Sequence, residues 1–215
     1  MRSETIKISQ SLDQIGPDEW NRLVPANSPT LSFEFLNALE KSGCVSEETG
    51  WKPRHVTLHN QNGIVAAVPC YLKYHSWGEF IFDWAWANAY DQAGLTYYPK
   101  LLIAVPFTPI TGSRLLVQPN QDRTALQKQL TDAVSLLAEE EAVSSVKRII
   151  KNVSASPYSD KSIAIQATAG MANCARGSKT QSQLILQQAA QALQVAKDAT
   201  SNDPVVWKAG EVVVA

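Results

Sequence analysis

The sequence of 215 residues has few cysteines, no long apolar run and almost no net charge. Its three cysteines, Cys44, Cys70 and Cys174, form no CxxC pair, which argues against a disulfide framework or a cysteine-based zinc site. A cytoplasmic location is therefore expected. No stretch of about 18 apolar residues predicts a transmembrane helix, and the polar N-terminus lacks the apolar segment of a signal peptide.

The formal net charge of -1 gives no indication of a nucleic-acid partner. Histidine is also scarce. His55 and His59 are four residues apart on a predicted strand, which separates them by about 13 Å and excludes a shared metal ion. We therefore predict neither nucleic-acid binding nor a metal site.

Aromatic residues are confined almost entirely to the first part of the chain. All five Phe, five of six Trp and five of six Tyr precede residue 108, whereas residues 143–215 carry four acidic and eight basic side chains. An Ala/Gln-rich helix is predicted over 179–200, with small side chains that favour helix-mediated association. We predict a first domain over 1–145 and a mainly helical tail over 146–215.

Local patterns predict an α/β (α+β) fold for the first domain. Capping residues, Pro17 and glycines mark helix boundaries, and alternating apolar residues mark strands. The tail adds a possible helix over 163–173 and a β-prone run over 211–214. In the first domain the expected strands are 4–9, 54–59, 64–74, 79–82, 101–106 and 114–117. The expected helices begin at Pro17, span 32–42 and 84–93, and run from a cap at Asn120 or Asp122 to about residue 141.

Between Gly50 and Val117, reactive polar residues alternate with aromatic ones, as expected of a site. The turn Ser76–Gly78 would bring His75 near Glu79, and such a pair can accept a proton from an attacking amine; a solvated hairpin tip is the alternative. Asp83 is a second candidate base, or the cap of the following helix.

The same stretch also contains candidate ligand-binding residues. Lys73, Lys100 and Arg114 can hold an anionic donor or substrate, although ordinary surface charge explains them as well. Large aromatic residues can line an acyl pocket or stack on a sugar, and core packing is the alternative for most of them. The aromatic candidates are Trp77, Trp84, Trp86, Tyr90, Tyr97 and Tyr98.

Several strings in this order resemble the FemAB-like family of predicted N-acyltransferases in the GNAT superfamily, also called the peptidoglycan biosynthesis/recognition family. The resemblance covers about residues 10–145. It rests on Phe33-Glu34-Phe35-Leu36-Asn37-Ala38-Leu39-Glu40-Lys41-Ser42-Gly43, Glu48-Thr49-Gly50-Trp51-Lys52-Pro53-Arg54-His55, Tyr71-Leu72-Lys73-Tyr74-His75-Ser76-Trp77-Gly78-Glu79-Phe80, Phe82-Asp83-Trp84-Ala85-Trp86-Ala87 and Val105-Pro106-Phe107-Thr108-Pro109-Ile110-Thr111-Gly112-Ser113-Arg114.

The resemblance implies a GNAT-like mixed, twisted sheet and transfer of an acyl or aminoacyl group to an amine. Family members look about twice as long, so we expect an incomplete copy with an unrelated or aberrant tail. The GNAT pyrophosphate loop is absent, which leaves acyl-CoA and an aminoacyl donor both open. Two hypotheses follow: an acyltransferase with a small amine acceptor, or a non-catalytic ligand-binding or assembly module.

Overall fold

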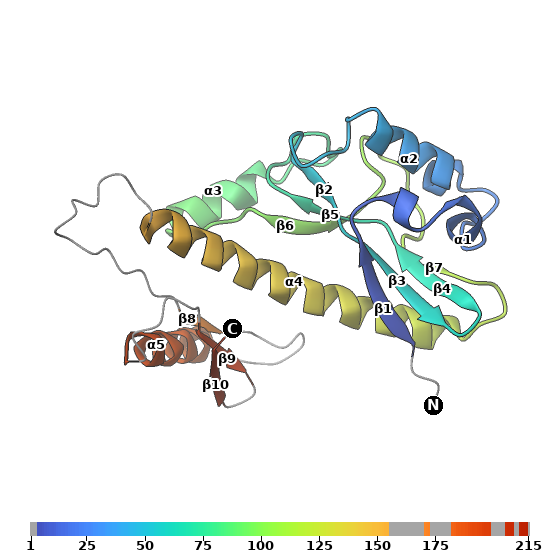
Figure 1. Cartoon of the computed structure of the whole chain (residues 1–215). Helices are drawn as coiled ribbons and strands as arrows, with labels where there is room; N and C mark the ends of the chain where they lie inside the picture. The colour runs from blue at the N-terminus through green and yellow to red at the C-terminus, as the bar shows by residue number, and fades with distance from the viewer. Residues whose placement is uncertain (1–3, 155–169, 173–181, 199–204, 209–210, 215) are drawn as a thin grey trace. The chain divides into compact units, whose positions relative to one another are not determined.

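The computed structural model describes residues 4–154, 170–172, 182–198, 205–208 and 211–214 (Figure 1). The chain divides into two compact units, residues 1–136 and 137–215, and the division falls within the long helix α4 (Arg123–Ser154). The mixture of antiparallel sheets and helices confirms the predicted α+β class. The domain boundary expected after residue 145 stays a prediction.

The first unit contains a four-stranded antiparallel sheet in the order β1-β3-β4-β7. Its strands are β1 (Thr5–Ser9), β3 (His55–Asn60), β4 (Gly63–Val68) and β7 (Leu116–Val117). Apolar side chains are buried along β3 and β4, and the register between these strands shifts at Leu58/His59. These strands therefore form the centre of the unit.

A second antiparallel sheet has the order β2-β5-β6, with β2 (Trp51–Pro53), β5 (Cys70–Lys73) and β6 (Lys100–Ile103). The prediction of one strand over 64–74 was wrong, because β4 ends at Val68 and β5 begins in the other sheet. Pro69, which has no N–H to donate to a ladder, lies at the break. Beside this break, Arg54 N donates to Cys70 O at 2.8 Å. One bent hairpin therefore joins the two sheets.

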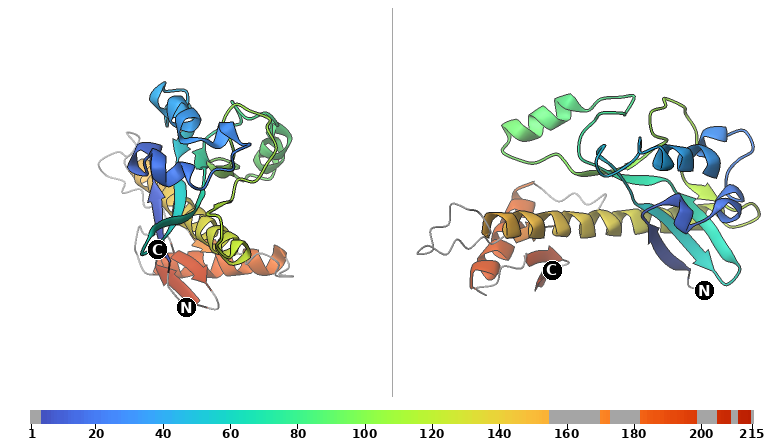
Figure 2. Two further views of the ribbon diagram at one scale, coloured as in Figure 1. Left: turned by 90° about the vertical axis from the view of Figure 1, so that its right-hand side faces the viewer. Right: turned by 45° about the horizontal axis from the view of Figure 1, so that its top comes forward.

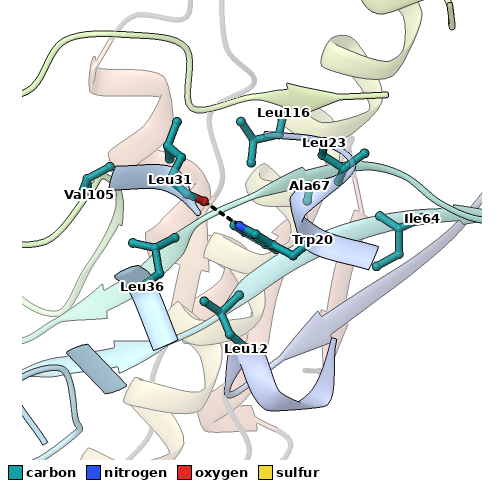
Figure 3. Packing of buried hydrophobic residues seen from close by; sticks show 9 residues of the cluster. All are labelled: Leu12, Trp20, Leu23, Leu31, Leu36, Ile64, Ala67, Val105 and Leu116. Carbon is teal, nitrogen blue, oxygen red and sulfur yellow. Dashed lines mark hydrogen bonds between the residues drawn. The ribbon is translucent and has the colours of Figure 1, made fainter. Parts of the chain in front are cut away.

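Short helices cover the first sheet: α1 (Pro17–Asn21) and α2 (Phe33–Lys41), with 3-10 turns at Leu12–Gln14 and Pro29–Leu31. Ser32 caps α2 by accepting from Phe35 N, as its position in the sequence predicts. At the core, Trp20 is fully buried and its Nε1 donates to Leu31 O at 2.8 Å (Figure 3). The surrounding cluster includes Leu12, Leu23, Leu36, Ile64, Ala67, Val105 and Leu116.

Helix α3 (Trp84–Gln92) differs from α2 in having no buried residue. It confirms the helix predicted over 84–93. The strand predicted over 79–82 is wrong, because these residues adopt neither helix nor strand. The long helix α4 begins after Asp122, whose carboxylate accepts from Ala125 N at 3.0 Å, and its Leu126 and Leu130 are buried.

The second unit contains the C-terminal part of α4 and a β-α-β-β segment: β8 (Gly170–Ala172), α5 (Ser182–Asp198), β9 (Val205–Lys208) and β10 (Glu211–Val214). The sheet order is β10-β9-β8, and β8 runs parallel to β9. Helix α5 lies against this sheet (Figure 2). It confirms the helix predicted within 179–200. A strand occupies 170–172, where a helix was predicted, and residues 163–169 lie outside the described part.

Across the described residues, no helix is both long enough and apolar enough to span a bilayer.

Candidate functional site

The candidate site lies on one face of the β2-β5-β6 sheet. Trp51 is opposite Lys73 across β2 and β5, and Lys73 is opposite Lys100 across β5 and β6. Residues paired directly across strands project to the same face of a sheet. The Lys73 ammonium lies 3.9 Å from the centre of the Trp51 ring, so strand register creates a row of one aromatic and two cationic side chains.

Lys100 joins two carboxylates that sequence analysis had singled out. Its Nζ donates to Glu79 Oε2 at 2.8 Å and also to Asp83 Oδ2. Both carboxylate side chains are mostly buried, so these ion pairs are screened less than surface pairs. We refer to Lys73, Ser76, Glu79, Asp83, Tyr98 and Lys100 as the Lys100 cluster.

The second oxygen of Asp83 belongs to a hydroxyl network. Tyr98 Oη donates to Asp83 Oδ1 at 2.7 Å, Ser76 Oγ also bonds to Oδ1, and the two hydroxyls are 2.7 Å apart. Asp83 occupies the N-cap position of α3, but its side chain makes no capping hydrogen bond. The interpretation of its carboxylate as a helix cap was therefore wrong, because Lys100, Ser76 and Tyr98 occupy it instead.

Two side chains fix the turn after β5 by hydrogen bonds to one of its backbone oxygens. Lys73 Nζ donates to Trp77 O at 2.8 Å, and Trp51 Nε1 donates to the same oxygen at 3.2 Å. Gly78 has a φ of 81°, and a Cβ there would lie 2.5 Å from the Phe107 ring. Only glycine suits that conformation and contact, so this turn places Glu79 beside Lys100.

Burial and charge shift the pKa values of the cluster in different directions. Burial lowers the pKa of Lys73 to about 8, although the nearby Glu79 carboxylate opposes this effect. For Lys100, burial also acts to lower the pKa, but hydrogen bonds to Asp83 and Glu79 outweigh it and raise the pKa. Burial acts to raise the pKa of Asp83, yet hydrogen bonds from Lys100, Tyr98 and Tyr97 leave it lowered.

The two carboxylate oxygens of Glu79 differ in their hydrogen bonding. Oε2 binds Lys100, whereas Oε1 is buried and no described residue hydrogen-bonds to it. The side chain as a whole is only 9% exposed. Buried acceptors are normally hydrogen-bonded, so Oε1 is the exception among the carboxylate oxygens of the Lys100 cluster.

Exposed aromatic rings border the cluster. Trp77 and Trp86 are 64% and 66% exposed, and half of Trp84 is exposed. Phe82 and Trp84 stack with ring centres 4.7 Å apart, and Trp77 meets both edge-on. Tyr97 packs edge-on against Tyr98, within 5.7 Å of the Lys100 ammonium. The expectation that most of these rings fill the core fails for the three tryptophans, which instead offer apolar faces to solvent.

Two other predicted site residues lie outside this network. His75 Nδ1 accepts from Trp77 N at 3.2 Å, and its ring packs against Gly50. Among the described residues no hydrogen bond joins His75 to Glu79 or Asp83. Arg114 donates to Ile110 O and to Gly112 O at 3.2 Å, within its own loop. Their proposed roles stay predictions.

No role was predicted for Ser76, and Tyr98 was predicted only as one of the aromatic candidates. Their hydroxyls meet Asp83 only because the chain turns at Ser76 and returns at Tyr98, and neither position carries a local signal. Lys73 and Lys100 were predicted as anion holders. The structure instead buries Lys73 beneath the Trp77 carbonyl and pairs Lys100 with protein carboxylates. The described residues include no group of side chains suited to holding a metal ion.

The fold and the cluster define an α+β protein with a charged, aromatic-bordered site. A family model described as FemAB-like, peptidoglycan biosynthesis/recognition, matches residues 11–169, and the chain belongs to this family. The match confirms the resemblance expected for about residues 10–145 and continues to residue 169. No curated protein and no solved structure gives a significant match.

Proposed function

We propose that this chain transfers an acyl or aminoacyl group to an amine in the formation of peptidoglycan, as a GNAT-like N-acyltransferase. The single observation that carries the proposal is Glu79 Oε1, a buried acceptor with no hydrogen-bond donor among the described residues. The family's link to peptidoglycan biosynthesis supports the same chemistry, since peptidoglycan contains both amines and amide bonds.

The proposed reaction joins an amine nitrogen to the carbonyl carbon of a thioester or ester. The new C–N bond forms as the C–S or C–O bond breaks, and the nitrogen loses a proton. Glu79 accepts this proton and returns it to the leaving sulfur or oxygen. Lys100 holds Glu79 Oε2, which leaves Oε1 to face the amine. To let the amine reach Oε1, the backbone would adjust within residues 74–83, which form neither helix nor strand.

Asp83 has a different role in this proposal. Its lowered pKa makes it a weak base, so it keeps a negative charge and positions Lys100, Ser76 and Tyr98. Arg114 is proposed to hold an anionic group of the donor, because a guanidinium has five N–H donors and the loop carbonyls engage only some of them. His75 is proposed as an auxiliary proton acceptor.

An assay for amide formation tests the proposal. Purified protein is incubated with acetyl-CoA or an alanyl thioester and with L-lysine as the amine, and new amide product is measured by mass spectrometry. Glu79→Gln removes the proton acceptor and should lower the rate by about 10²–10⁴-fold. Glu47→Gln is the matched control, since Glu47 pairs with Lys52 instead. Equal rates for wild type and Glu79→Gln would refute the assigned role.

The second candidate is a non-catalytic module that recognises peptidoglycan sugars. The exposed, mutually packed rings of Trp77, Phe82 and Trp84 favour it, because aromatic faces can stack on the apolar face of a sugar. Titration with an N-acetylated disaccharide, with tryptophan fluorescence as the readout, distinguishes recognition from catalysis. Binding that weakens in Trp84→Ala but persists in Glu79→Gln, without amide formation by the wild type, would favour recognition over catalysis.

A further inference from the structure

A cavity of about 350 Å³ lies between α2 and the edge strand β2, and none of the Lys100 cluster lines it. Its volume falls at the lower end of small-molecule sites, about 300–1,000 Å³. The charged and polar residues that decide its chemistry are Asn37, Glu40, Lys41, Ser46, Glu47 and Lys52.

Glu40 gives the cavity a buried negative charge. Its side chain is 8% exposed, Oε1 lies 2.8 Å from His55 Nε2, and Oε2 accepts from Leu12 N at 2.9 Å. His55 Nδ1 accepts from Cys70 N, so the ring proton is on Nε2 and is donated to Glu40. Each carboxylate oxygen can accept another hydrogen bond.

Asn37 lies on the same face of α2, three residues before Glu40. Its amide oxygen is buried, and no described residue donates to it. Because that oxygen has no surface open to the cavity, the Glu40 carboxylate is the acceptor expected to receive an ammonium group from a ligand.

Two lysines supply the opposite charge. Lys41 pairs with Asp13, and Lys52 Nζ pairs with Glu47 Oε1 at 2.8 Å. The side chains of Asp13 and Glu47 are 45% and 59% exposed. Exposed ion pairs contribute little stability, so a carboxylate from a ligand can replace either partner at small cost.

From these groups we infer that the cavity binds an amino acid or short peptide in its zwitterionic form. The ligand ammonium binds at Glu40, and its carboxylate binds at Lys52. This inference does not depend on the proposed acyl transfer, because the lining shares no residue with the Lys100 cluster. It adds a separate peptide-recognition site to the chain.

Calorimetric titration with the dipeptide L-alanyl-L-alanine tests the inference on the full chain. Two blocked analogues probe each end: the N-acetyl form lacks the ammonium, and the C-terminal amide lacks the carboxylate. We expect each blocked form to bind at least tenfold more weakly than the free dipeptide. Equal affinity of all three forms, or no heat of binding from the free dipeptide, would overturn the inference.

Variants locate the binding. Lys52→Met should weaken the free dipeptide at least tenfold and leave the affinity for the C-terminal amide unchanged. Lys128→Met is its control, because Lys128 is an exposed lysine paired with Asp132 on α4. Glu79→Gln should leave dipeptide binding intact, which separates failure of this inference from failure of the proposed catalysis. Unchanged binding in Lys52→Met would contradict the assigned carboxylate site.

Discussion

At the scale of single residues, the Lys100 cluster balances two ammonium groups against two carboxylates. Lys73 and Lys100 face Glu79 and Asp83, so the cluster is neutral when all four are ionised. Lys73 is the member that loses its charge first, because its pKa is about 8. Above that pH the cluster becomes negative and attracts a cationic amine more strongly.

The titration of Lys73 is directly measurable. NMR of ¹³C-labelled lysine side chains should give a midpoint near pH 8 for Lys73. Because Glu79 raises this pKa by favouring the ammonium, Glu79→Gln should move the midpoint lower, whereas Glu47→Gln should not move it. A midpoint near the ordinary value of 10.5 would show that Lys73 is well solvated.

The same shift predicts how stability depends on pH. Below about pH 8, Lys73 is charged in both the folded and unfolded states, and its burial reduces the free energy of unfolding. Between about 8 and 10.5, the unfolded state holds this proton more tightly than the folded state. The contribution of Lys73 to stability therefore rises with pH across that window.

Asp83 changes stability in the same direction, but in the acid range. Its pKa is lowered in the folded state, so its contribution to stability is present above pH 3.8 and is lost as pH falls through the folded-state value. Asp83→Asn should cost about 2 kcal/mol at neutral pH, the scale of hydrogen bonds to a charged group. Urea unfolding from pH 7 to 2 should show a shallower acid loss in the variant than in wild type; identical slopes would count against this assignment.

At the scale of elements, α2 and α3 are two nine-residue helices with opposite environments. Leu36 of α2 is packed in the core around Trp20, whereas α3 has no buried residue. Leu36→Ala should cost about 2–5 kcal/mol through lost packing and the cavity left behind. Trp86→Ala in α3 should change stability by no more than about 0.5 kcal/mol. Urea unfolding of both variants checks the contrast, and a large loss in Trp86→Ala would show that α3 is packed.

Local signals predicted the helices better than the strands. Ser32 and Asp122 cap their helices through contacts within three residues, so the sequence alone identified Ser32 and reduced the other cap to Asn120 or Asp122. The break at Pro69 was missed because apolar residues continue on both sides of it. Residues 79–82 look like a strand in isolation, but Glu79 instead binds Lys100, a partner 21 residues away that only the β5–β6 register brings close.

In the candidate site, too, local contacts were easier to predict than contacts between distant residues. Glu79 and Asp83 were separate candidate bases, and the structure brings both to Lys100. The expected pairing of His75 with Glu79 depended on the missing strand. Ser76 and Tyr98 meet at Asp83 across 22 residues, and no local pattern could reveal that contact.

At the scale of the whole molecule, the described residues form two sheets in the first compact unit and one in the second. The first contains both proposed ligand sites. In the second, α5 turns Gln188, Ala192 and Ala196 to one face at intervals of four residues, and all three are buried. Because α5 lies against β8 and β9, its small side chains already have a partner within their own unit. Association through residues 179–200 stays a proposal.

Ala192→Asp tests whether the buried face of α5 packs within its own unit or mediates association between chains. An unpaired carboxylate there should destabilise the packing of α5 by about 3 kcal/mol or more. Hydrogen exchange of residues 182–198, measured by mass spectrometry, should therefore accelerate. Gln191→Asp is the control, since it introduces the same charge at the adjacent exposed position. Sedimentation velocity separates the alternatives: if the face served association, Ala192→Asp would lower the molecular mass while exchange at low protein concentration stayed as slow as in wild type.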